Sequence, residues 1–261
     1  VGFDVQQSRR AGLAGVATAE TLAELAARST LVCLSLPSAA VVEDVVLGTG
    51  SLLDALQPGS LVIDLSTSTP EVSRRVAARL AERGVDFADA PVSGGQEGAR
   101  AASLALMVGA APATFERCRT ILAALGRSVV HMGPVGAGNI AKLINNMIVG
   151  SAFAVIAEGF ALAVRHGVDP ATLYEAIRGG WAGSKVLDVS APAIAARAYV
   201  PGGTIDMLEK DLSYALAAAS QVRSPVPMTA VAHQLLVAGQ ASGHGADSQP
   251  ALFELWVRND V

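Results

Sequence analysis

The pattern of apolar residues changes its period near residue 135, and this change limits the folds open to the chain. Before it, short β-branched runs alternate with amphipathic stretches, whereas every later stretch has helical spacing. Strands separated by helices of about a dozen residues are typical of βαβ units in a largely parallel sheet. We therefore predict an α/β domain over residues 1–134 and an all-α domain over residues 135–261, joined by a long helix.

The expected elements of the two domains follow from these periods. In the first domain we expect strands at 2–5, 30–35, 60–65, 85–88, 104–108 and 128–132, with helices at 22–27, 40–47, 70–83 and 112–125. In the second domain we expect a linker helix over 138–166, followed by helices at 170–178, 185–198, 206–222, 227–241 and 248–259.

The linker helix is apolar nearly all round, because only Lys142, Glu158 and Arg165 carry charge within it. Such a helix must be buried between other elements. Its longest uncharged stretch, residues 143–157, is shorter than the roughly 20 residues that a bilayer requires. We therefore expect no membrane span.

Composition excludes several classes of function. The formal net charge is −4 and no basic run occurs, so nucleic-acid binding has no electrostatic basis. Cys33 and Cys118 are isolated in apolar patterns and predict buried, reduced thiols in a cytoplasmic protein. The four histidines show no ligand spacing, so no metal site is expected. No signal peptide is visible at the start of the chain.

The segment 136–146, Gly-Ala-Gly-Asn-Ile-Ala-Lys-Leu-Ile-Asn-Asn, carries the strongest local indication of chemistry. Lys142 and Asn146 are four residues apart, so a helix places them on the same face. A lysine held against apolar surroundings gives up its proton more readily, which suits an acid/base group aimed into a pocket. The alternative is a lysine that extends to solvent beside an asparagine with a local capping role.

Polar turns after three of the expected strands are further candidates. Ser93, Gly94 and Gly95 follow the strand at 85–88, and two consecutive glycines let backbone N–H groups approach a carboxylate closely. The turn at 36–38, Leu-Pro-Ser, and the run at 64–70, Asp-Leu-Ser-Thr-Ser-Thr-Pro, end at the sheet edge where open α/β folds bind ligands. Each turn has the alternative of capping the next helix.

Asp4 ends the first expected strand. In a dinucleotide-binding fold, an acid at the end of the second strand bonds the ribose hydroxyls and favours NAD over NADP. Arg9 and Arg10 follow it, and an arginine there can instead hold a 2′-phosphate. The alternative for Asp4 is a simple turn residue.

Taken in order, these motifs resemble the β-hydroxyacid dehydrogenase family, that of 3-hydroxyisobutyrate dehydrogenase. The series is Leu-Pro, Asp-Leu-Ser-Thr, Asp-Ala-Pro-Val-Ser-Gly-Gly, Gly-x-Gly-x-x-x-Lys-x-x-Asn-Asn and Glu-Lys-Asp at 209–211, and it covers essentially the whole chain. Within the family, the segments 176–188 and 201–211 are similar to those of tartronate semialdehyde reductase (2-hydroxy-3-oxopropionate reductase).

The resemblance implies a Rossmann domain that binds NAD, with NADP as the alternative, and a helical domain that forms a homodimer or homotetramer. It implies that Lys142 is catalytic, that Asn146 contacts a small carboxylate substrate and supports Lys142, and that Ser93, Gly94 and Gly95 hold the substrate carboxylate. Leu36, Pro37 and Thr67 would line the NAD groove beyond Asp4. Lys210 would lie near the nicotinamide.

The chain departs from the family pattern at several points. The family opens with a strand and a Gly-x-Gly-x-x-Gly turn, which this chain lacks, so we expect about 30 residues of a first βα unit to precede Val1. Ala102 and Ala110 stand where the family usually has glycine, and Trp181 replaces a smaller apolar residue. These departures leave 3-hydroxyisobutyrate, threonate and other 3-hydroxy acids open as substrates. They also leave open a non-catalytic relative that binds a small acid.

Overall fold

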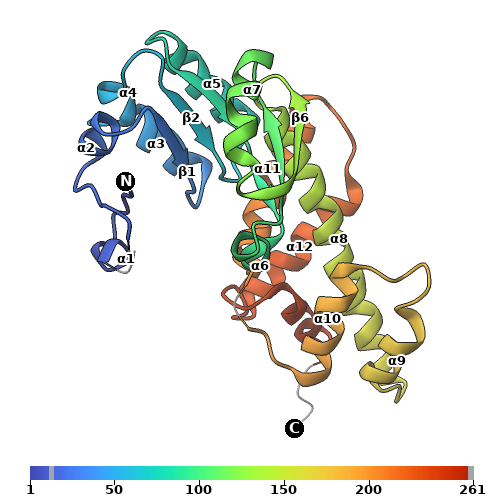
Figure 1. The fold of residues 1–261 in the computed structure, drawn as a ribbon. Helices are drawn as coiled ribbons and strands as arrows, with labels where there is room; N and C mark the ends of the chain where they lie inside the picture. Colours follow the sequence, from blue (N-terminus) through green and yellow to red (C-terminus); the bar gives the residue numbers. More distant parts are fainter. Residues whose placement is uncertain (12–14, 201, 258–261) are drawn as a thin grey trace. The chain divides into compact units, whose positions relative to one another are not determined.

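The computed structural model describes residues 1–11, 15–200 and 202–257 (Figure 1). Contacts divide the chain into two compact units, Val1–Lys142 and Leu143–Val261. The first unit has a Rossmann-like arrangement of helices around a mixed sheet, and the second is helical. The predicted fold class, α/β followed by all-α with a long helix between, is confirmed. The helix α8, Ala137–Arg165, contributes its first turns to unit 1 and the rest to unit 2.

The sheet of unit 1 has six strands in the order β1-β2-β3-β5-β4, with β6 paired to β5. The strands β1 (Leu31–Leu34), β2 (Leu61–Asp64) and β3 (Asp86–Asp89) are parallel. The strand β5 (Leu104–Gly109) is antiparallel to β3 and to the short β4 (Val92–Ser93), and parallel to β6 (Gly126–Gly133). The sheet is therefore largely parallel, as expected, but mixed, because the chain reverses through β4 before it enters β5.

Helices cover both faces of this sheet. The helix α7 (Pro112–Leu122) contributes the buried Cys118 and Leu122 to an apolar cluster that includes Leu61 and Ile63 of β2. The prediction of two buried cysteines is thus confirmed for Cys118 but wrong for Cys33, which is exposed in the edge strand β1. Because side chains alternate along a strand, Val62 faces the opposite side, and all four β2 residues are buried. The other helices of unit 1 are α1 (Gln7–Ala11), α2 (Leu22–Ala27), α3 (Ala39–Leu47), α4 (Leu52–Ala55), α5 (Pro70–Ala81) and α6 (Gly95–Arg100).

The helices that follow β1 and β2 begin where the sequence places capping residues. The hydroxyl oxygen of Ser38 accepts a hydrogen bond from Val41 N, and that of Thr69 accepts one from Val72 N. Pro70 occupies the first turn of α5, where its missing N–H is not needed. These capping roles fall within two of the polar turns that the sequence marks as candidates, so at Ser38 and Thr69 the capping alternative is the one realised.

The strand predicted at 2–5 is wrong. Only Gly2 is paired there, in an isolated parallel bridge to Thr18, and Val5 is 86% exposed. A strand needs a neighbour that takes up its backbone hydrogen bonds and a face that becomes buried, and residues 3–5 obtain neither within the described residues. The sequence pattern also missed α1, α4, β4 and α6, each of six residues or fewer and too short to show a period.

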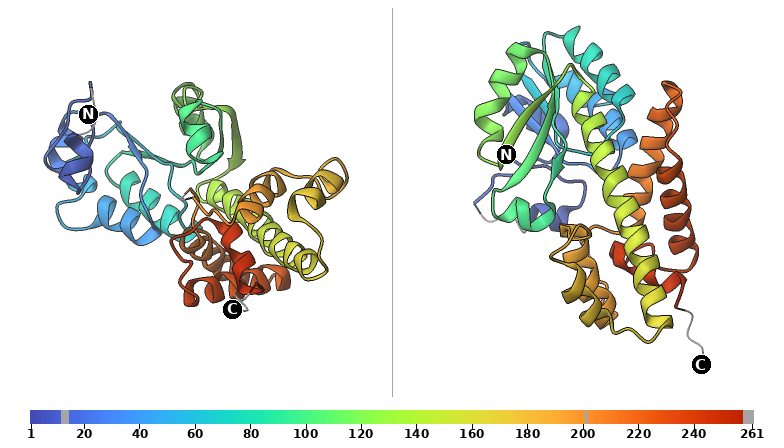
Figure 2. Two further views of the ribbon diagram at one scale, coloured as in Figure 1. Left: turned by 90° about the horizontal axis from the view of Figure 1, so that it is seen from below. Right: turned by 90° about the vertical axis from the view of Figure 1, so that its right-hand side faces the viewer.

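Unit 2 consists of the remainder of α8 with α9 (Pro170–Ile177), α10 (Lys185–Ala196), α11 (Ile205–Gln221), α12 (Pro227–Ala241) and η1 (Gln249–Leu255). The last element is a 3₁₀-helix and ends earlier than the predicted helix at 248–259, of which residues 258 and 259 lie outside the described residues. The core of the unit draws on all of these helices except α9, which packs at its margin. Figure 2 shows α8 beside α11 and α12.

The helix α8 is long and apolar enough to cross a membrane by length and composition alone. In unit 2 one face of it joins the core through Phe153, Ala157 and Phe160. On another face, Ile148, Val155 and Leu162 are 67%, 61% and 60% exposed and are spaced seven residues apart. Only 33% of its most apolar stretch is buried, so the prediction that this helix is enclosed between other elements is wrong for the described residues of a single chain. One helix of this kind is weak evidence of a membrane span.

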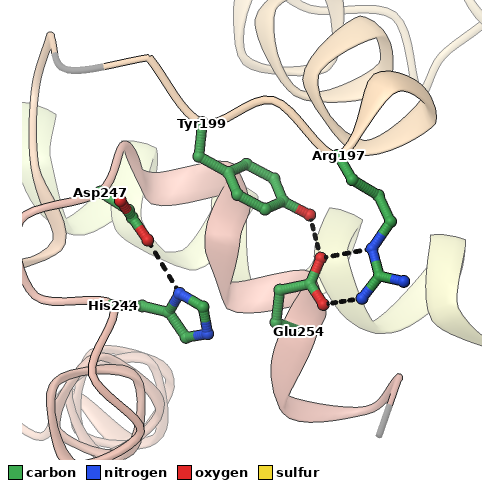
Figure 3. A network of polar contacts seen from close by, with 5 residues as sticks. All are labelled: Arg197, Tyr199, His244, Asp247 and Glu254. Atoms are coloured by element: carbon green, nitrogen blue, oxygen red, sulfur yellow. Dashed lines mark hydrogen bonds and ion pairs between the residues drawn. The ribbon is translucent and has the colours of Figure 1, made fainter. Parts of the chain in front are cut away.

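A polar network connects the end of α10 to η1 (Figure 3). Arg197, in a left-handed conformation with φ 47°, binds both carboxylate oxygens of Glu254, and the Tyr199 hydroxyl donates to the same group. Burial alone would raise the pKa of Glu254, but the hydrogen bonds from Arg197 and Tyr199 lower it. The network fixes the segment that leads into α11, and His244 and Asp247 form a separate pair nearby.

Candidate active site

The ends of β1 and β2 meet at the carboxyl edge of the sheet. The backbone N–H of Leu36 donates to the Ser66 hydroxyl at 2.8 Å, which joins the two turns that follow these strands. Leu36 and Thr67 are half-buried and Pro37 is exposed. Among the residues proposed for the cofactor groove, these three thus belong to adjoining turns at the edge where open α/β sheets bind ligands.

Two buried carboxyl groups lie beneath this edge. Asp64 and Asp89 end β2 and β3, face each other in the strand register, and are both fully buried. Burial raises the pKa of Asp64 to about 6; the hydrogen bonds from Ser66 oppose this shift and the charge of Asp89 adds to it. One oxygen of Asp64, Oδ2, has no hydrogen-bond partner among the described residues. Its ionised form is therefore poorly stabilised.

Asp64→Asn should change how stability depends on pH. Since the folded-state pKa of Asp64 lies above its ordinary value of 3.8, its ionisation destabilises the fold as pH rises from about 4 to 6. The asparagine variant lacks this penalty. Relative to the parent protein, it should gain about 2 kcal/mol between pH 4.5 and 7.5, measured by urea unfolding at both values. Parallel pH profiles for the two proteins would contradict the prediction.

Asp89 holds the start of α8. Its Oδ1 accepts from the backbone N–H of Gly136 at 2.7 Å, and its Oδ2 accepts from that of Asn139 at 2.8 Å. Burial raises the pKa of Asp89 to about 6, although these two hydrogen bonds oppose the shift. A negative charge is favourable at a helix start, where N–H groups lack partners within the helix.

The side chain of Asn139 continues the same cluster. Its Oδ1 accepts from Ser68 N at 2.8 Å and its Nδ2 donates to Ser73 Oγ at 3.0 Å, and Asn139 is fully buried. Next to it, a Cβ on Gly138 would lie 2.3 Å from Met107 O and 2.7 Å from Asp89 O. The helix backbone therefore rests directly on two strands, which explains the second glycine of the Gly-x-Gly-x-x-x-Lys motif.

Lys142 follows Asn139 by three residues in α8 and is half-buried. It is the last residue of unit 1. Lys142 lies one turn after the start of α8, which is held against the ends of β3 and β5. The position of its backbone therefore depends on those strands.

Ser93 ends β4, Gly94 follows it, and Gly95 is the first residue of α6. Gly94 has φ 133° and Gly95 has φ 61°, which are conformations that residues with side chains rarely adopt. Both glycines are exposed and Ser93 is half-buried. The turn is thus open to a ligand, and its two glycines have a conformational requirement as well as the proposed role in binding.

Ala102, just beyond α6, has φ 48°. A left-handed conformation costs a residue with a Cβ about 1–2 kcal/mol. Ala102→Gly should therefore stabilise the protein by about 0.5–1 kcal/mol after the greater flexibility of unfolded glycine is subtracted. Ala101→Gly is the matched control, since its φ of −86° suits alanine, and it should destabilise. Thermal unfolding of both variants measures the difference, and equal shifts would refute the prediction. Ala110, the other departure, does not have a positive φ.

In unit 2, Asn146 and Lys210 share a partner. Asn146 Nδ2 donates to Asp211 Oδ2 at 2.6 Å, and Lys210 Nζ donates to Asp211 Oδ1 at 2.7 Å. Asn146 and Asp211 are buried, and Lys210 also lies over the ring of Tyr214. The sequence motifs named Asn146 and Lys210 but assigned no role to Asp211, which brings the two together.

Asp4 has local partners. Its Oδ1 accepts from Gln6 N at 2.8 Å, and Arg9 lies 3.7 Å from its Oδ2. Asp4 therefore lies in a turn rather than at the end of a strand. Its proposed contact with a ribose stays a prediction, as do the roles of the other residues named from the motifs.

Comparison with known proteins identifies the family. Residues 1–133 match the family model described as the NAD binding domain of 6-phosphogluconate dehydrogenase, and residues 136–256 match that described as NAD-binding of NADP-dependent 3-hydroxyisobutyrate dehydrogenase. The chain is 35% identical to 2-(hydroxymethyl)glutarate dehydrogenase of Eubacterium barkeri over 97% of its own length and 85% of that protein. The chain belongs to the β-hydroxyacid dehydrogenase family.

Other members of the family agree in fold and differ in named substrate. 2-Hydroxy-3-oxopropionate reductase of Escherichia coli is 32% identical over 92% of this chain and 82% of that protein. The structure of Mycobacterium tuberculosis 3-hydroxyisobutyrate dehydrogenase with L-serine has a TM-score of 0.83 and 31% identity, covering 94% of this chain and 85% of that one. This β-hydroxyacid dehydrogenase is thus an NAD(P)-dependent oxidoreductase acting on a hydroxy acid, as the resemblance implied.

Sequence reasoning assigned no function to Asp89, Asn139 or Asp211 in this family member. All three stand inside motifs that it quoted, so the residues were visible but their partners were not. Asp89 contacts residues 47 and 50 positions away, and Asp211 contacts Asn146 across 65 positions, beyond any local period.

Proposed function

We propose that the enzyme reduces a short 3-oxo acid to the 3-hydroxy acid, and that its substrate is 2-hydroxy-3-oxopropionate. The observation that carries this proposal is the Asn146–Asp211–Lys210 cluster, in which the buried Asn146 and Asp211 and the half-buried Lys210 are joined by hydrogen bonds. Buried polar groups of this kind suit a small substrate rich in hydroxyl and carboxylate oxygens. The similarity of the segments 176–188 and 201–211 to tartronate semialdehyde reductase supports the substrate.

In this proposal Lys142 donates a proton to the aldehyde oxygen as negative charge develops on it. Asn146 orients the substrate hydroxyl, and its own amide is held by Asp211. Ser93 and the backbone N–H groups of Gly94 and Gly95 hold the substrate carboxylate, which limits the orientations of the carbonyl. The reaction adds one hydride to the carbonyl carbon and one proton to its oxygen, and it yields glycerate from 2-hydroxy-3-oxopropionate.

The cofactor would lie along the carboxyl edge of the sheet and supplies the hydride when it is bound. The adjoining turns that contain Leu36, Pro37 and Thr67 fit this role, because they are accessible and follow parallel strands. Asp4 favours NADH over NADPH by repelling a 2′-phosphate, with Arg9 beside it as the opposing influence. The 261 residues contain no Gly-x-Gly-x-x-Gly turn, so they do not include that site for the pyrophosphate.

A substrate panel tests the proposal. The full-length protein is assayed with NAD and glycerate, 3-hydroxyisobutyrate, threonate and 2-(hydroxymethyl)glutarate, and with NADH and 2-hydroxy-3-oxopropionate. The highest kcat/KM should belong to the 2-hydroxy-3-oxopropionate and glycerate pair. A higher kcat/KM for 3-hydroxyisobutyrate would identify that compound as the substrate instead. Trp181, the exposed residue that departs from the family pattern, would then be the first residue to mutate. The absence of turnover with every compound would favour a relative that only binds a small acid.

The helical unit also supports the proposal that copies of the chain associate as a homodimer or homotetramer. Ile148, Val155 and Leu162 form a row of exposed apolar side chains on α8. Sedimentation velocity would show a single species of two or four chains, whereas a monomer at micromolar concentration would refute the proposal. We place the enzyme in the cytoplasm, in keeping with its two cysteines, which form no disulfide with each other.

A further inference from the structure

The start of α8 is held by side chains that are distant in sequence and that take no part in the proposed chemistry. Asp89 accepts from the N–H of Gly136, just before the helix, and from that of Asn139 in its first turn. The side chain of Asn139 reaches from that turn to Ser68 and Ser73. All four hydrogen bonds are between 2.7 and 3.0 Å, and both Asp89 and Asn139 are fully buried. We name these two residues the α8 clamp.

The clamp and Gly138 together limit how the helix can move. Asp89 sets how far the first turn lies from the end of β3. The side chain of Asn139 sets the rotation of the helix about its axis, because its two hydrogen bonds go to the turn after β2 and to α5. Gly138, pressed against Met107 O and Asp89 O, leaves no room for movement toward the sheet.

Rotation about the helix axis decides where Lys142 is aimed. Lys142 lies three residues after Asn139, and successive helical residues are about 100° apart, at 3.6 residues per turn. A change in rotation at Asn139 is therefore passed on in full to Lys142. A displacement of about 1 Å in a catalytic group can cost on the order of 100-fold in rate.

We propose that Asp89 and Asn139 are positioning residues that set the direction in which Lys142 projects from α8. This inference rests on the proposed function for its effect on turnover, but the placement of Lys142 can be tested without it. Neither residue needs to touch the substrate. The clamp acts through the backbone of the helix that carries the acid/base group.

Lysine labelling gives a direct test, since the chain has only three lysines, Lys142, Lys185 and Lys210. Reductive dimethylation with carbon-13 formaldehyde gives one NMR signal for each lysine besides the N-terminal amine, and it preserves their charge. Lys142→Met assigns the first signal. In Asn139→Leu, which removes both side-chain hydrogen bonds, we expect the Lys142 signal to shift while those of Lys185 and Lys210 stay.

A graded series separates positioning from simple loss of stability. Ser73→Ala removes one partner of Asn139, and Asn139→Gln keeps both the donor and the acceptor. We expect kcat to fall about 10- to 100-fold in Asn139→Leu, less in Ser73→Ala, and to recover substantially in Asn139→Gln, with KM within about two-fold throughout. Ser73→Ala keeps the series informative should Asn139→Leu fail to fold.

The outcomes distinguish the two proposals. An unmoved Lys142 signal in folded Asn139→Leu and Ser73→Ala overturns the clamp, whatever happens to turnover. If Lys142→Met loses turnover, a shifted signal with kcat unchanged in Asn139→Leu also overturns it, because the direction of a catalytic Lys142 would then not matter. A shifted signal together with normal turnover of Lys142→Met would instead refute the proposed catalytic lysine and leave the structural role of the clamp standing.

Discussion

Replacing Lys142 by alanine should lower kcat by about 10²- to 10⁴-fold while the protein stays folded. General acid catalysis by a positioned side chain contributes about this factor. Lys142 is only half-buried, and the buried apolar side chains of both units stay in place when it is replaced. Its removal should therefore spare the fold. Steady-state kinetics and circular dichroism on the same preparations measure both quantities.

Lys185→Ala is the matched control for this experiment. Lys185 is exposed at the start of α10, and its loss should leave kcat and KM within about two-fold of the parent values. Lys142→Met retains most of the side-chain volume without the charge, so it separates packing from proton transfer. Near-normal turnover in both Lys142 variants would remove the lysine from the mechanism.

Gly138→Ala should destabilise unit 1 by about 3 kcal/mol and reduce activity with it. An added Cβ would lie 2.3 Å from Met107 O, 2.7 Å from Asp89 O and 2.9 Å from Asp89 Oδ2, and the first two are backbone atoms that cannot rotate away. The first turn of α8 must then move off the strand ends, and the hydrogen bonds to Asp89 lengthen. Urea unfolding of the purified variant measures the loss.

The same helix provides controls with graded crowding. A Cβ on Gly150 would meet Leu212 Cδ2 at 3.0 Å, a side-chain atom that can adjust, and a Cβ on Gly159 would meet nothing within 4 Å. Gly159→Ala should stabilise by about 0.5–1 kcal/mol, because alanine loses less freedom than glycine on entering a helix. Equal stability of Gly138→Ala and Gly159→Ala would contradict the inference that α8 lies too close to the sheet for a Cβ at position 138.

The fold was largely predictable because its signals are local. The strands β1, β2 and β5 carry β-branched or apolar runs, and α5 and α7 begin with prolines where the pattern places their first turns. The prediction failed at residues 2–5, which have the composition of a strand but form only one isolated β-bridge. Strand formation depends on a partner, and composition alone contains no information about partners.

The residues of the candidate site were also predictable only where the signal was local. Ser93, Gly94, Gly95, Lys142 and Asn146 are each visible as short motifs whose residue types suggest chemistry. The groups that hold them are not visible, because Asp89 contacts residue 139 across 50 positions and Asp211 contacts residue 146 across 65. Such pairs are produced by the topology of the chain. They emerge only when the strands and helices are assembled.

The unequal faces of α8 have a consequence for mutation. Phe153, Ala157 and Phe160 are enclosed, so polar replacements there would act on folding itself. Ile148, Val155 and Leu162 remain in contact with water, and charged replacements would alter solubility and self-association long before they unfolded the helix. The apolar sequence of α8 thus contains buried positions that do not tolerate a charged residue and exposed positions that do.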